Sequence, residues 1–581
     1  MIGSKYRWRS RQLREHVEVL DGKRSPSMLL YNATYLHGTV KQWIQGNIWV
    51  YQDRIVYVGD KWPELIDENC EQVDCHNSLL VPGYMEPHVH PFQLYNPLSF
   101  AKYAFNFGTT ITVNDNLALV LKYKKREAFS FLEKLNTIPA TMYWWSRFDS
   151  QTEITDEETV FSHANIKSWI EHPQVIQGGE LTGWPKLLNG DDLMLHWMQE
   201  TKSMNKKIEG HFPGASEKTL AKLKLLGADS DHEAMTGEEV KRRLLQGYMV
   251  PLRYSSIRPD LPNILDDLNK LGINNYENFM LTTDGSPPSF YENGIIDLLI
   301  KICIEKGVPP IDAYLMATLN PAKYYHLDHL HGLIATGRVA NINFISDEKL
   351  PRPVSVLAKG QWVRKDNHNI ENTVDIQWED FGFSPLTIDW ELTTDDLQFS
   401  MPFGIKLENA VITKPYSINI DLSVEEIDPN ADECFLTFIN RNGRWRINTV
   451  LKGFAKNLGG FVSSFTNTGD ILLIGKRKSD LLLAFQRMKE IGGGLVIVDK
   501  GSIIFELPLP LGGVVSDLAI EELIVKEKQL RNILHERGYL FEDPIYTLLF
   551  FSSTHLPYIR MTPRGLFDVM KKRVLFPTIM R

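Results

Sequence analysis

Hydrophobic residues follow two different spacings along the chain, and the change between them divides the sequence into parts. Residues 28 to 82 contain short apolar segments such as MLLYNATYL and SLLVPG, separated by polar turns, which is typical of a small β domain. From residue 83 onward, apolar strands alternate with helical stretches such as KYKKREAFSFLEKL and EEVKRRLLQG. This alternation predicts a parallel sheet whose strands are joined by helices.

The alternating region contains eight candidate strands. They are residues 79–90, 109–115, 140–145, 175–181, 206–212, 227–233, 248–256 and 279–285. Eight strand–helix units over about 200 residues match a (β/α)8 barrel of the TIM type, which typically needs ~250 residues. We therefore predict an α/β protein built around such a barrel.

Beyond the barrel the pattern changes twice. HGLIATGRVANINFIS and VSVLAKGQWV return to the short-strand style, so we expect them to complete one small composite β-sandwich with residues 28–82. Residues 366–385 are polar and irregular and predict a linker, and the remainder predicts a separate α/β domain. The expected divisions are 1–82 (N-terminal segment and first part of the sandwich), 83–332 (barrel), 333–370 (second part of the sandwich) and 371–581 (C-terminal α/β domain).

Composition narrows the classes of function. The net charge of -9 over 581 residues argues against bulk attraction to nucleic acid or to anionic membranes. The four cysteines include no CxxC pair, which disfavours a disulfide framework or a cysteine zinc site and favours a reducing cytoplasm. The basic N-terminus lacks the apolar segment of a secretory signal, and no apolar run approaches the ~18 residues of a membrane span. We expect a cytoplasmic protein that forms a homo-oligomer.

The residues at the ends of the predicted strands carry the chemistry. Enzymes with this barrel assemble their sites from the C-terminal ends of the strands. His88 and His90 end the first strand, and side chains two residues apart share a face of a strand. Further strands end at Glu180, at His211, at His232 with Glu233 beside it, and at Asp284.

Imidazoles combined with carboxylates predict a metal centre. This donor set suits manganese, iron or zinc, and a bridging carboxylate suits two ions. Two divalent ions ~3.5–4 Å apart can share a hydroxide and make it nucleophilic near neutral pH.

Two other motifs are weaker indications of a functional site. His326, His329 and His331 imitate the first motif, but they follow a helix where the chain leaves the barrel, so surface exposure and helix capping are favoured over a metal role. Gly492, Gly493 and Gly494 stand between a helix and a strand, the reverse of the order in phosphate loops, which favours a helix cap and a turn.

In the order PHVH, GGEL, IEGHFPG, SDHE and LTTDG, these motifs resemble the amidohydrolase superfamily and, in detail, the microbial adenine deaminases. The resemblance extends from about residue 31 to the C-terminus and includes IDAYLMATLNPAKYY, GGGLVIVDKG, ELPLPLGGVVSD and YTLLFFSSTHLPYIRMT. At the end of the fourth strand, related superfamily members that act on cyclic amides carry a carboxylated lysine. This chain has Glu180 there, which favours the deaminases.

The resemblance implies roles for the strand-end residues. His88 and His90 would bind one ion with Asp284, Glu180 would bridge both ions, and His211 with His232 would hold the second. The implied reaction is hydrolysis of adenine to hypoxanthine and ammonia by a metal-bridging hydroxide, with a purine as substrate, manganese as the first choice of metal and a place in purine salvage.

The catalytic residues implied are Asp284, Glu180 and Glu233. Asp284 would move the proton from the hydroxide to the ammonia. Glu233 would orient His232, or would be a surface glutamate that begins the next helix. Arg253 would contact the substrate or form a structural ion pair.

The chain departs from the family pattern at three places near the expected substrate. VNDNL at 113–117 replaces a segment with histidine and glutamate, Gly285 replaces a second aspartate, and residues 463–470 lack the usual histidine and aspartate. Because recognition of the base depends on hydrogen bonds to its polar atoms, these departures keep two alternatives open. One is an amidohydrolase that acts on another purine, a pterin or a cyclic amide. The other is a catalytically silent relative that still binds metal.

Overall fold

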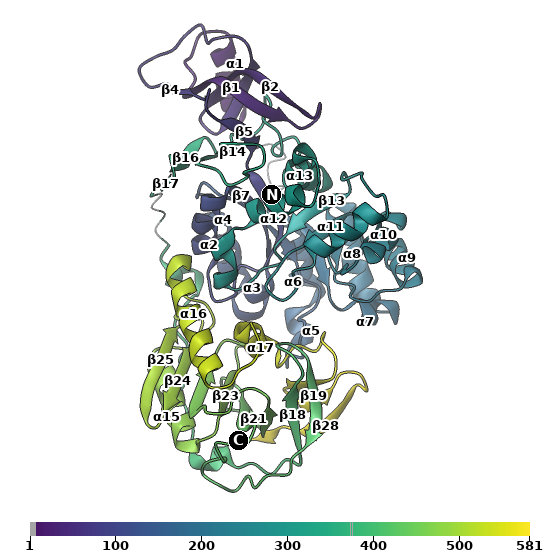
Figure 1. The fold of residues 1–581 in the computed structure, drawn as a ribbon, viewed down its shortest axis with the longest axis vertical. Helices are drawn as coiled ribbons and strands as arrows, with labels where there is room; N and C mark the ends of the chain where they lie inside the picture. Colours follow the sequence, from purple (N-terminus) through teal and green to yellow (C-terminus); the bar gives the residue numbers. More distant parts are fainter. Residues whose placement is uncertain (1–6, 372–373, 375) are drawn as a thin grey trace.

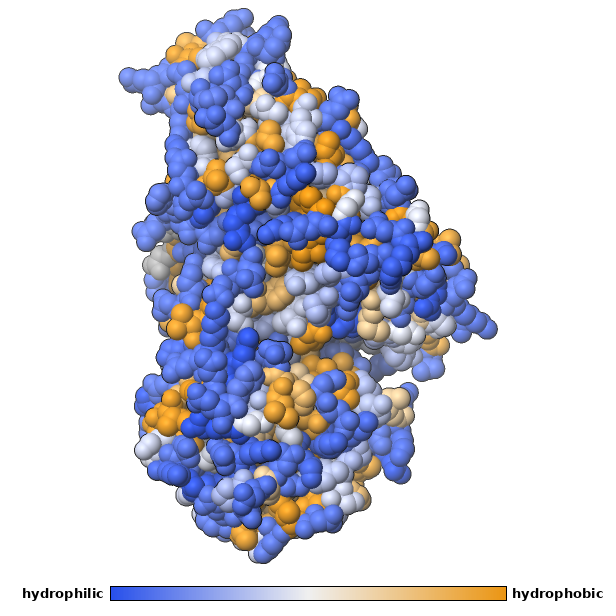
Figure 2. Space-filling model, in the orientation of Figure 1, coloured by the Kyte–Doolittle hydropathy of each residue, from blue (hydrophilic) through white to orange (hydrophobic). Residues whose placement is uncertain are grey.

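The computed structural model describes residues 7–371, 374 and 376–581, which are arranged as an elongated molecule (Figure 1). The N-terminal sheet lies at one end, the barrel in the middle and the C-terminal domain at the other end. The face drawn in Figure 2 is predominantly hydrophilic, with hydrophobic residues scattered over it. Within the described ranges, no helix is both long and apolar enough to cross a membrane.

Eight parallel strands form the middle of the molecule, as the alternating pattern predicts. The strands of the first sheet are β6 (Tyr84–Val89), β7 (Thr109–Asp115), β8 (Thr141–Ser146), β9 (Val175–Leu181), β10 (Lys207–Gly210) and β11 (Ser230–Asp231), each paired with the next. A second parallel pair follows, β12 (Val250–Arg253) and β13 (Phe279–Thr282). A single bridge between Ser230 and Met249 joins the two groups. At the other seam, the buried Glu86 of β6 accepts hydrogen bonds from Thr282, the last residue of β13, and from Thr283 just after it.

Helices cover the outside of these strands because one face of each helix is apolar. In α11 the buried residues Leu261, Ile264, Leu265 and Leu268 follow the three- and four-residue spacing of one helical face. The helices of this part, α11 included, are α2 (Pro97–Ala104), α3 (Leu117–Lys122), α4 (Lys125–Leu135), α5 (Glu157–Val160), α6 (His163–Glu171), α7 (Trp184–Leu188), α8 (Asp192–Ser203), α9 (Glu217–Leu226), α10 (Gly237–Leu245), α11 (Leu261–Lys270), α12 (Ile296–Glu305), α13 (Pro310–Met316) and α14 (Leu319–Tyr324).

The structure divides the first predicted strand, residues 79–90, into two. β5 (Leu79–Pro82) pairs with strands of the N-terminal sheet, and β6 starts the barrel only after Gly83. The strands predicted at 206–212, 227–233, 248–256 and 279–285 are shorter than predicted, because the chain leaves the sheet before their last residues. Those last residues form the loops at the mouth of the barrel.

The two β segments that flank the barrel join, as predicted. Their strands form one continuous nine-stranded sheet. Its residues contribute to two hydrophobic clusters, one that includes Leu30 and one that includes Leu29. Its strands are β1 (Met28–His37), β2 (Gln42–Tyr51), β3 (Arg54–Gly59), β4 (Glu71–Asp74), β5, β14 (Ile342–Ile345), β15 (Ser355–Ala358), β16 (Gln361–Lys365) and β17 (His368–Asn369). Helix α1 (Ser10–Leu20) precedes them, and its Val19 belongs to the cluster that includes Leu29.

The C-terminal part is an α/β domain around a second nine-stranded sheet. Its strands are β18 (Phe403–Leu407), β19 (Thr413–Ser417), β20 (Glu433–Ile439), β21 (Trp445–Lys452), β22 (Gly460–Ser463), β23 (Ile471–Gly475), β24 (Gly494–Asp499), β25 (Ser502–Pro508) and β29 (Ile579–Met580), and β26 (Ile559–Thr562), β27 (Gly565–Asp568) and β28 (Arg573–Pro577) form a small separate sheet. Helix α15 (Lys478–Glu490) ends before the three glycines, which turn the chain into β24 as the sequence predicts.

Helices α16 (Ile520–Glu536) and α17 (Pro544–Phe550) attach the C-terminal domain to the barrel. The fully buried Glu527 of α16 accepts hydrogen bonds from the backbone N–H and hydroxyl of Ser289, at 2.6 and 2.7 Å. Arg531 donates to the same carboxylate at 3.0 Å. On α17, the Tyr546 hydroxyl donates to the carbonyl of Gly285, directly after the end of β13. The domain is therefore held against the mouth of the barrel.

Replacing Glu527 should weaken this attachment. Glu527→Ala leaves the Ser289 N–H and the Arg531 guanidinium without their acceptor, a loss of about 2–3 kcal/mol for a buried, charge-assisted contact. We expect a lower midpoint of thermal unfolding by calorimetry, whereas Gln529→Ala, on the exposed side of the same helix, should leave it unchanged. Equal midpoints for the two variants would show that this contact does not hold the domains together.

Candidate metal centre

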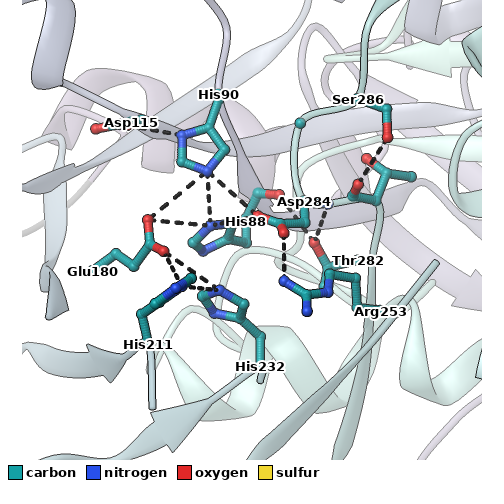
Figure 3. Close-up of polar contacts among 12 residues, drawn as sticks. His88, His90, Asp115, Glu180, His211, His232, Arg253, Thr282, Asp284 and Ser286 are labelled. Carbon is teal, nitrogen blue, oxygen red and sulfur yellow. Dashed lines mark hydrogen bonds and ion pairs between the residues drawn. The ribbon is translucent and has the colours of Figure 1, made fainter. Parts of the chain in front are cut away.

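The six residues predicted as metal ligands converge at the mouth of the barrel (Figure 3). Each lies at or just after the end of a strand, so the parallel strands bring side chains from five places in the sequence to one rim. His88 ends β6 with His90 just beyond it, and Glu180 is on β9. His211, His232 and Asp284 follow β10, β11 and β13.

Glu180 lies between two pairs of imidazoles. Its Oε2 is 3.9 Å from both His88 Nε2 and His90 Nε2. Its Oε1 is 2.6 Å from His211 Nδ1 and 3.5 Å from His232 Nε2. Each oxygen of one carboxylate therefore faces its own pair of histidines, which is the arrangement a bridging ligand needs.

Asp284 completes the side of the centre near β6. Its Oδ1 is 3.2 Å from His88 Nε2 and 3.4 Å from His90 Nε2. Its Oδ2 accepts a hydrogen bond from Arg253 Nη1 at 2.7 Å. Burial by itself raises the pKa of this carboxyl, but the Arg253 charge and the histidine hydrogen bonds outweigh it and hold the pKa well below its usual value. Asp284 is therefore ionised, with one oxygen toward the imidazoles.

Glu209, which the motifs did not single out, fixes two of the histidines. Its Oε2 lies 3.0 Å from His88 Nδ1, and its Oε1 lies 3.1 Å from His232 Nδ1. Burial alone would raise the pKa of Glu209, but the charge of His88 and the histidine hydrogen bonds lower it to about 2. An ionised carboxylate only accepts hydrogen bonds, so each Nδ1 carries a proton, and the Nε2 atom of each ring faces Glu180.

Asp115 does the same for His90. Its Oδ2 lies 2.8 Å from His90 Nδ1, which leaves His90 Nε2 for the centre. The fully buried Arg147 binds Asp115 through Nε and Nη2, and the same Nη2 lies 2.8 Å from Glu180 Oε2. Arg147 thereby offsets part of the negative charge that these two carboxylates bring into the barrel.

The donor atoms fit divalent metal ions. His88, His90 and Glu180 offer ligand atoms within 4.8 Å of one another, and so do Glu180, His211 and His232. Glu180 belongs to both sets, and His88, His232 and Asp284 form a third. Nitrogen and oxygen donors with carboxylate-oriented imidazoles are typical of manganese, iron and zinc sites. The residues that lie close together would thus accommodate two ions with Glu180 between them.

Glu233 is buried, with 2% of its surface exposed, so it is not a surface glutamate. It pairs with Arg253 and Arg258, and its Oε1 lies 3.5 Å from His211 Nδ1. The carboxylate at His232 Nδ1 is Glu209, not Glu233. Arg253 joins Glu233 to Asp284 and so forms an ion pair within the centre.

A cavity of about 740 Å³ opens over the centre and has walls from both domains. Phe92, Leu117 and Leu121 contribute from the barrel side, while Leu549, Phe550 and Leu556 contribute from the C-terminal domain. His555 also lines the cavity, and its Nδ1 lies 3.2 Å from the carbonyl of Gln151. Burial and the nearby His211 lower the pKa of His555 to about 3, so its ring is neutral.

The departures noted in the sequence lie at the cavity or beside it. Asp115, from the altered segment after the second strand, orients His90. A side chain at Gly285 would have its Cβ 2.7 Å from the His90 backbone nitrogen, and φ there is 59°, so this backbone accepts only glycine without strain. Phe465, Thr466 and Asn467 line the cavity in place of the usual histidine and aspartate.

The competing histidine cluster lies elsewhere. His331 is buried, and its Nε2 is 3.0 Å from the Tyr143 hydroxyl, while His326 and His329 are exposed. None of the three belongs to a potential metal-binding set found in the described part of the chain. The preference for a structural or surface role is therefore consistent with their positions.

Comparisons with known proteins extend over the whole chain. The model of the amidohydrolase family matches residues 79–365, and that of the adenine deaminase C-terminal domain matches residues 410–573. A protein of Bacillus cereus named "Putative adenine deaminase" is 55% identical over 99% of this chain and 97% of its own length. An adenine deaminase of Kosmotoga olearia is 28% identical over 95% of this chain and 97% of its own length.

Solved structures are more distant. A β-aspartyl dipeptidase from Fervidobacterium islandicum AW-1 has 16% identity and a TM-score of 0.47, covering 61% of this chain and 100% of its own. The two family matches and the relative with 55% identity decide the assignment. The chain belongs to the adenine deaminase family of the amidohydrolases.

Proposed function

We propose that this protein is a metal-dependent hydrolytic deaminase that converts adenine and water to hypoxanthine and ammonia. The observation that carries the proposal is the pair of ligand sets that share Glu180 at the mouth of the barrel. The names of relatives similar to it over nearly its full length supply the substrate.

In the proposed centre, His88, His90 and Asp284 would hold one ion and His211 with His232 would hold the other, with Glu180 as the carboxylate available to both. Divalent ions in such a centre lower the pKa of water enough to supply a nucleophile near neutral pH. Glu209 and Asp115 bind the Nδ1 atoms of three histidines, so Nε2 of each ring is the nitrogen that would bind an ion. Walls from both domains surround the cavity in which the substrate would lie.

Asp284 is the residue proposed to move the proton. Its carboxylate accepts the proton of the attacking water and returns it to the departing amine, so that the carbon–nitrogen bond breaks as the new carbon–oxygen bond forms. Arg253 keeps this carboxylate oriented toward the imidazoles, and Glu233 holds Arg253 in place. Glu180 and Glu233 act by placing charge and ligands rather than by moving protons.

Manganese as the native metal, a homo-oligomer, a cytoplasmic location and a role in purine salvage belong to the same proposal. We also propose that the N-terminal segment ends at residue 82, the barrel at residue 332 and the second part of the β-sandwich at residue 370. A second candidate function is hydrolysis of another purine, a pterin or a cyclic amide. Residues 465–467 stand where the family usually has histidine and aspartate, and this replacement favours the second candidate. The size of the cavity favours it too.

Ammonia release from adenine tests the proposed reaction directly. Purified protein loaded with manganese should release ammonia from adenine, and His88→Ala should abolish the release because one ion loses a ligand. His326→Ala, at an exposed histidine, is the matched control and should retain full turnover. No ammonia from adenine, with metal still bound, would exclude the adenine reaction and leave other cyclic amidines and amides, or a silent metal-binding protein.

The second prediction concerns Glu209. In Glu209→Gln, one of the two facing histidines meets an amide N–H instead of a carboxylate oxygen, so its own proton moves to Nε2 and blocks a ligand position. We expect metal affinity to fall about 10–100-fold, measured by competition with a chelator. Glu217→Gln, at an exposed residue of α9, should keep the original affinity. Unchanged affinity in Glu209→Gln would remove the orienting role.

The third prediction concerns Asp284. Asp284→Asn keeps the shape of the side chain but cannot accept the proton, so kcat should fall by about 10²–10⁴. Metal content, measured on the same preparation, separates loss of proton transfer from loss of an ion. A kcat within a factor of two of the original would assign the proton transfer to another residue.

A further inference from the structure

A half-buried lysine on the wall of the cavity has no partner for its charge among the residues that the structure describes. Lys122 is the last residue of α3 and lines the cavity. Burial, followed by the charge of Arg441, lowers the pKa of its ammonium to about 7. Its Nζ makes neither a hydrogen bond nor an ion pair with any residue that the structure describes.

A second cation faces the same point. A Cβ built on Gly469 would lie 3.0 Å from Lys122 Nζ and 3.3 Å from Arg441 Nη1. Gly469 has a φ of 74°, in the left-handed region that favours glycine, so the position beside it stays free of a side chain. Both cationic groups therefore converge on one place at the end of the loop 465–469, whose first three residues line the cavity.

The nearby Asp470 carboxylate attracts both cations but forms no ion pair with either of them within the described residues. Asp470 Oδ1 accepts hydrogen bonds from Asn440 Nδ2 at 2.9 Å and from the Arg441 backbone N–H at 3.0 Å. The Arg441 guanidinium itself has no hydrogen bond or ion pair within the described ranges. Two like charges at a partly buried site repel each other. An anion between them would offset this repulsion and would give both groups the ion-pair partner that they lack.

The size and lining of the cavity extend this argument to the substrate. A volume of about 740 Å³ lies within the ~300–1,000 Å³ range of sites for drug-sized ligands, so a free purine base leaves much of it unfilled. Leu117, Leu121 and Phe465 line the cavity and offer apolar contacts for a ring or spacer. Candidate metal ligands and Lys122 thus line one continuous cavity, and Arg441 approaches Lys122 from outside its lining.

We propose that Lys122 and Arg441, which meet beside Gly469, form an anion subsite, and that the preferred substrate is an aromatic amine that also carries a phosphate or carboxylate group. The inference rests on the proposed function for the bond that is hydrolysed, but the subsite itself does not depend on turnover. The reaction stays the same: water adds at the ring carbon, and ammonia leaves.

Two pairs of compounds test the subsite on the metal-loaded protein. Adenosine 5′-monophosphate is compared with adenosine, and pterin-6-carboxylate with 6-hydroxymethylpterin, by calorimetric binding and by ammonia release. The variants are Lys122→Met and Arg441→Met, with Lys124→Met as control because its side chain is 86% exposed. Thermal unfolding of every variant shows that it is folded.

We expect at least one anionic compound to bind tenfold or more tightly than its neutral counterpart. The pair that shows this preference identifies phosphate or carboxylate as the group recognised. The preference should fall to about one in Lys122→Met and in Arg441→Met and remain in Lys124→Met. No preference in either pair, or a preference that persists in Lys122→Met, would overturn the proposal.

The binding arm separates this proposal from the proposed function. A charge preference that depends on Lys122, with no ammonia released from any compound, would refute the deaminase and leave the anion subsite standing. Ammonia release from adenine without any charge preference would support the deaminase and refute the anion subsite.

Discussion

The metal centre depends on one buried carboxylate that contacts two imidazoles. Glu209 accepts from His88 Nδ1 and from His232 Nδ1, and these two histidines belong to different halves of the proposed two-ion centre. Because an ionised carboxylate cannot donate, a single side chain sets the tautomer of one ligand in each half. Gln177 Nε2 donates to Glu209 Oε2 at 2.6 Å, so the carboxylate is itself held in place.

Charge balance explains why so many acidic residues can lie within one barrel. Asp115, Glu180, Glu233 and Asp284 are all buried or nearly so, and each pairs with a guanidinium of Arg147 or Arg253. Removing either arginine would leave buried carboxylates without compensation, which is costly in a site of low polarity. Arg253 leaves Asp284 Oδ1 facing the histidines, and Arg147 shares Glu180 Oε2 with His88 and His90. Structural ion pairs and ligand geometry are therefore one network.

Much of the centre could be predicted from the sequence because the barrel places strand ends on one rim. His88, His90, Glu180, His211, His232 and Asp284 follow from that rule alone. Glu209 could also have been found, since it precedes His211 by two residues and shares its face of the strand. Arg147 could not, because its role depends on the pairing of β7 with β8. His555 and the Lys122–Arg441 pair could not either, because they depend on how a domain distant in sequence packs against the barrel.

The most direct test of the central claim is the position of the ions. Crystals grown with manganese should give two anomalous scattering peaks at coordination distance, roughly 2.0–2.3 Å, from their ligands. The structure predicts one peak beside His88 Nε2 and His90 Nε2, and a second beside His211 Nδ1 and His232 Nε2, with Glu180 between them. A single peak, or peaks remote from Glu180, would contradict the two-ion centre.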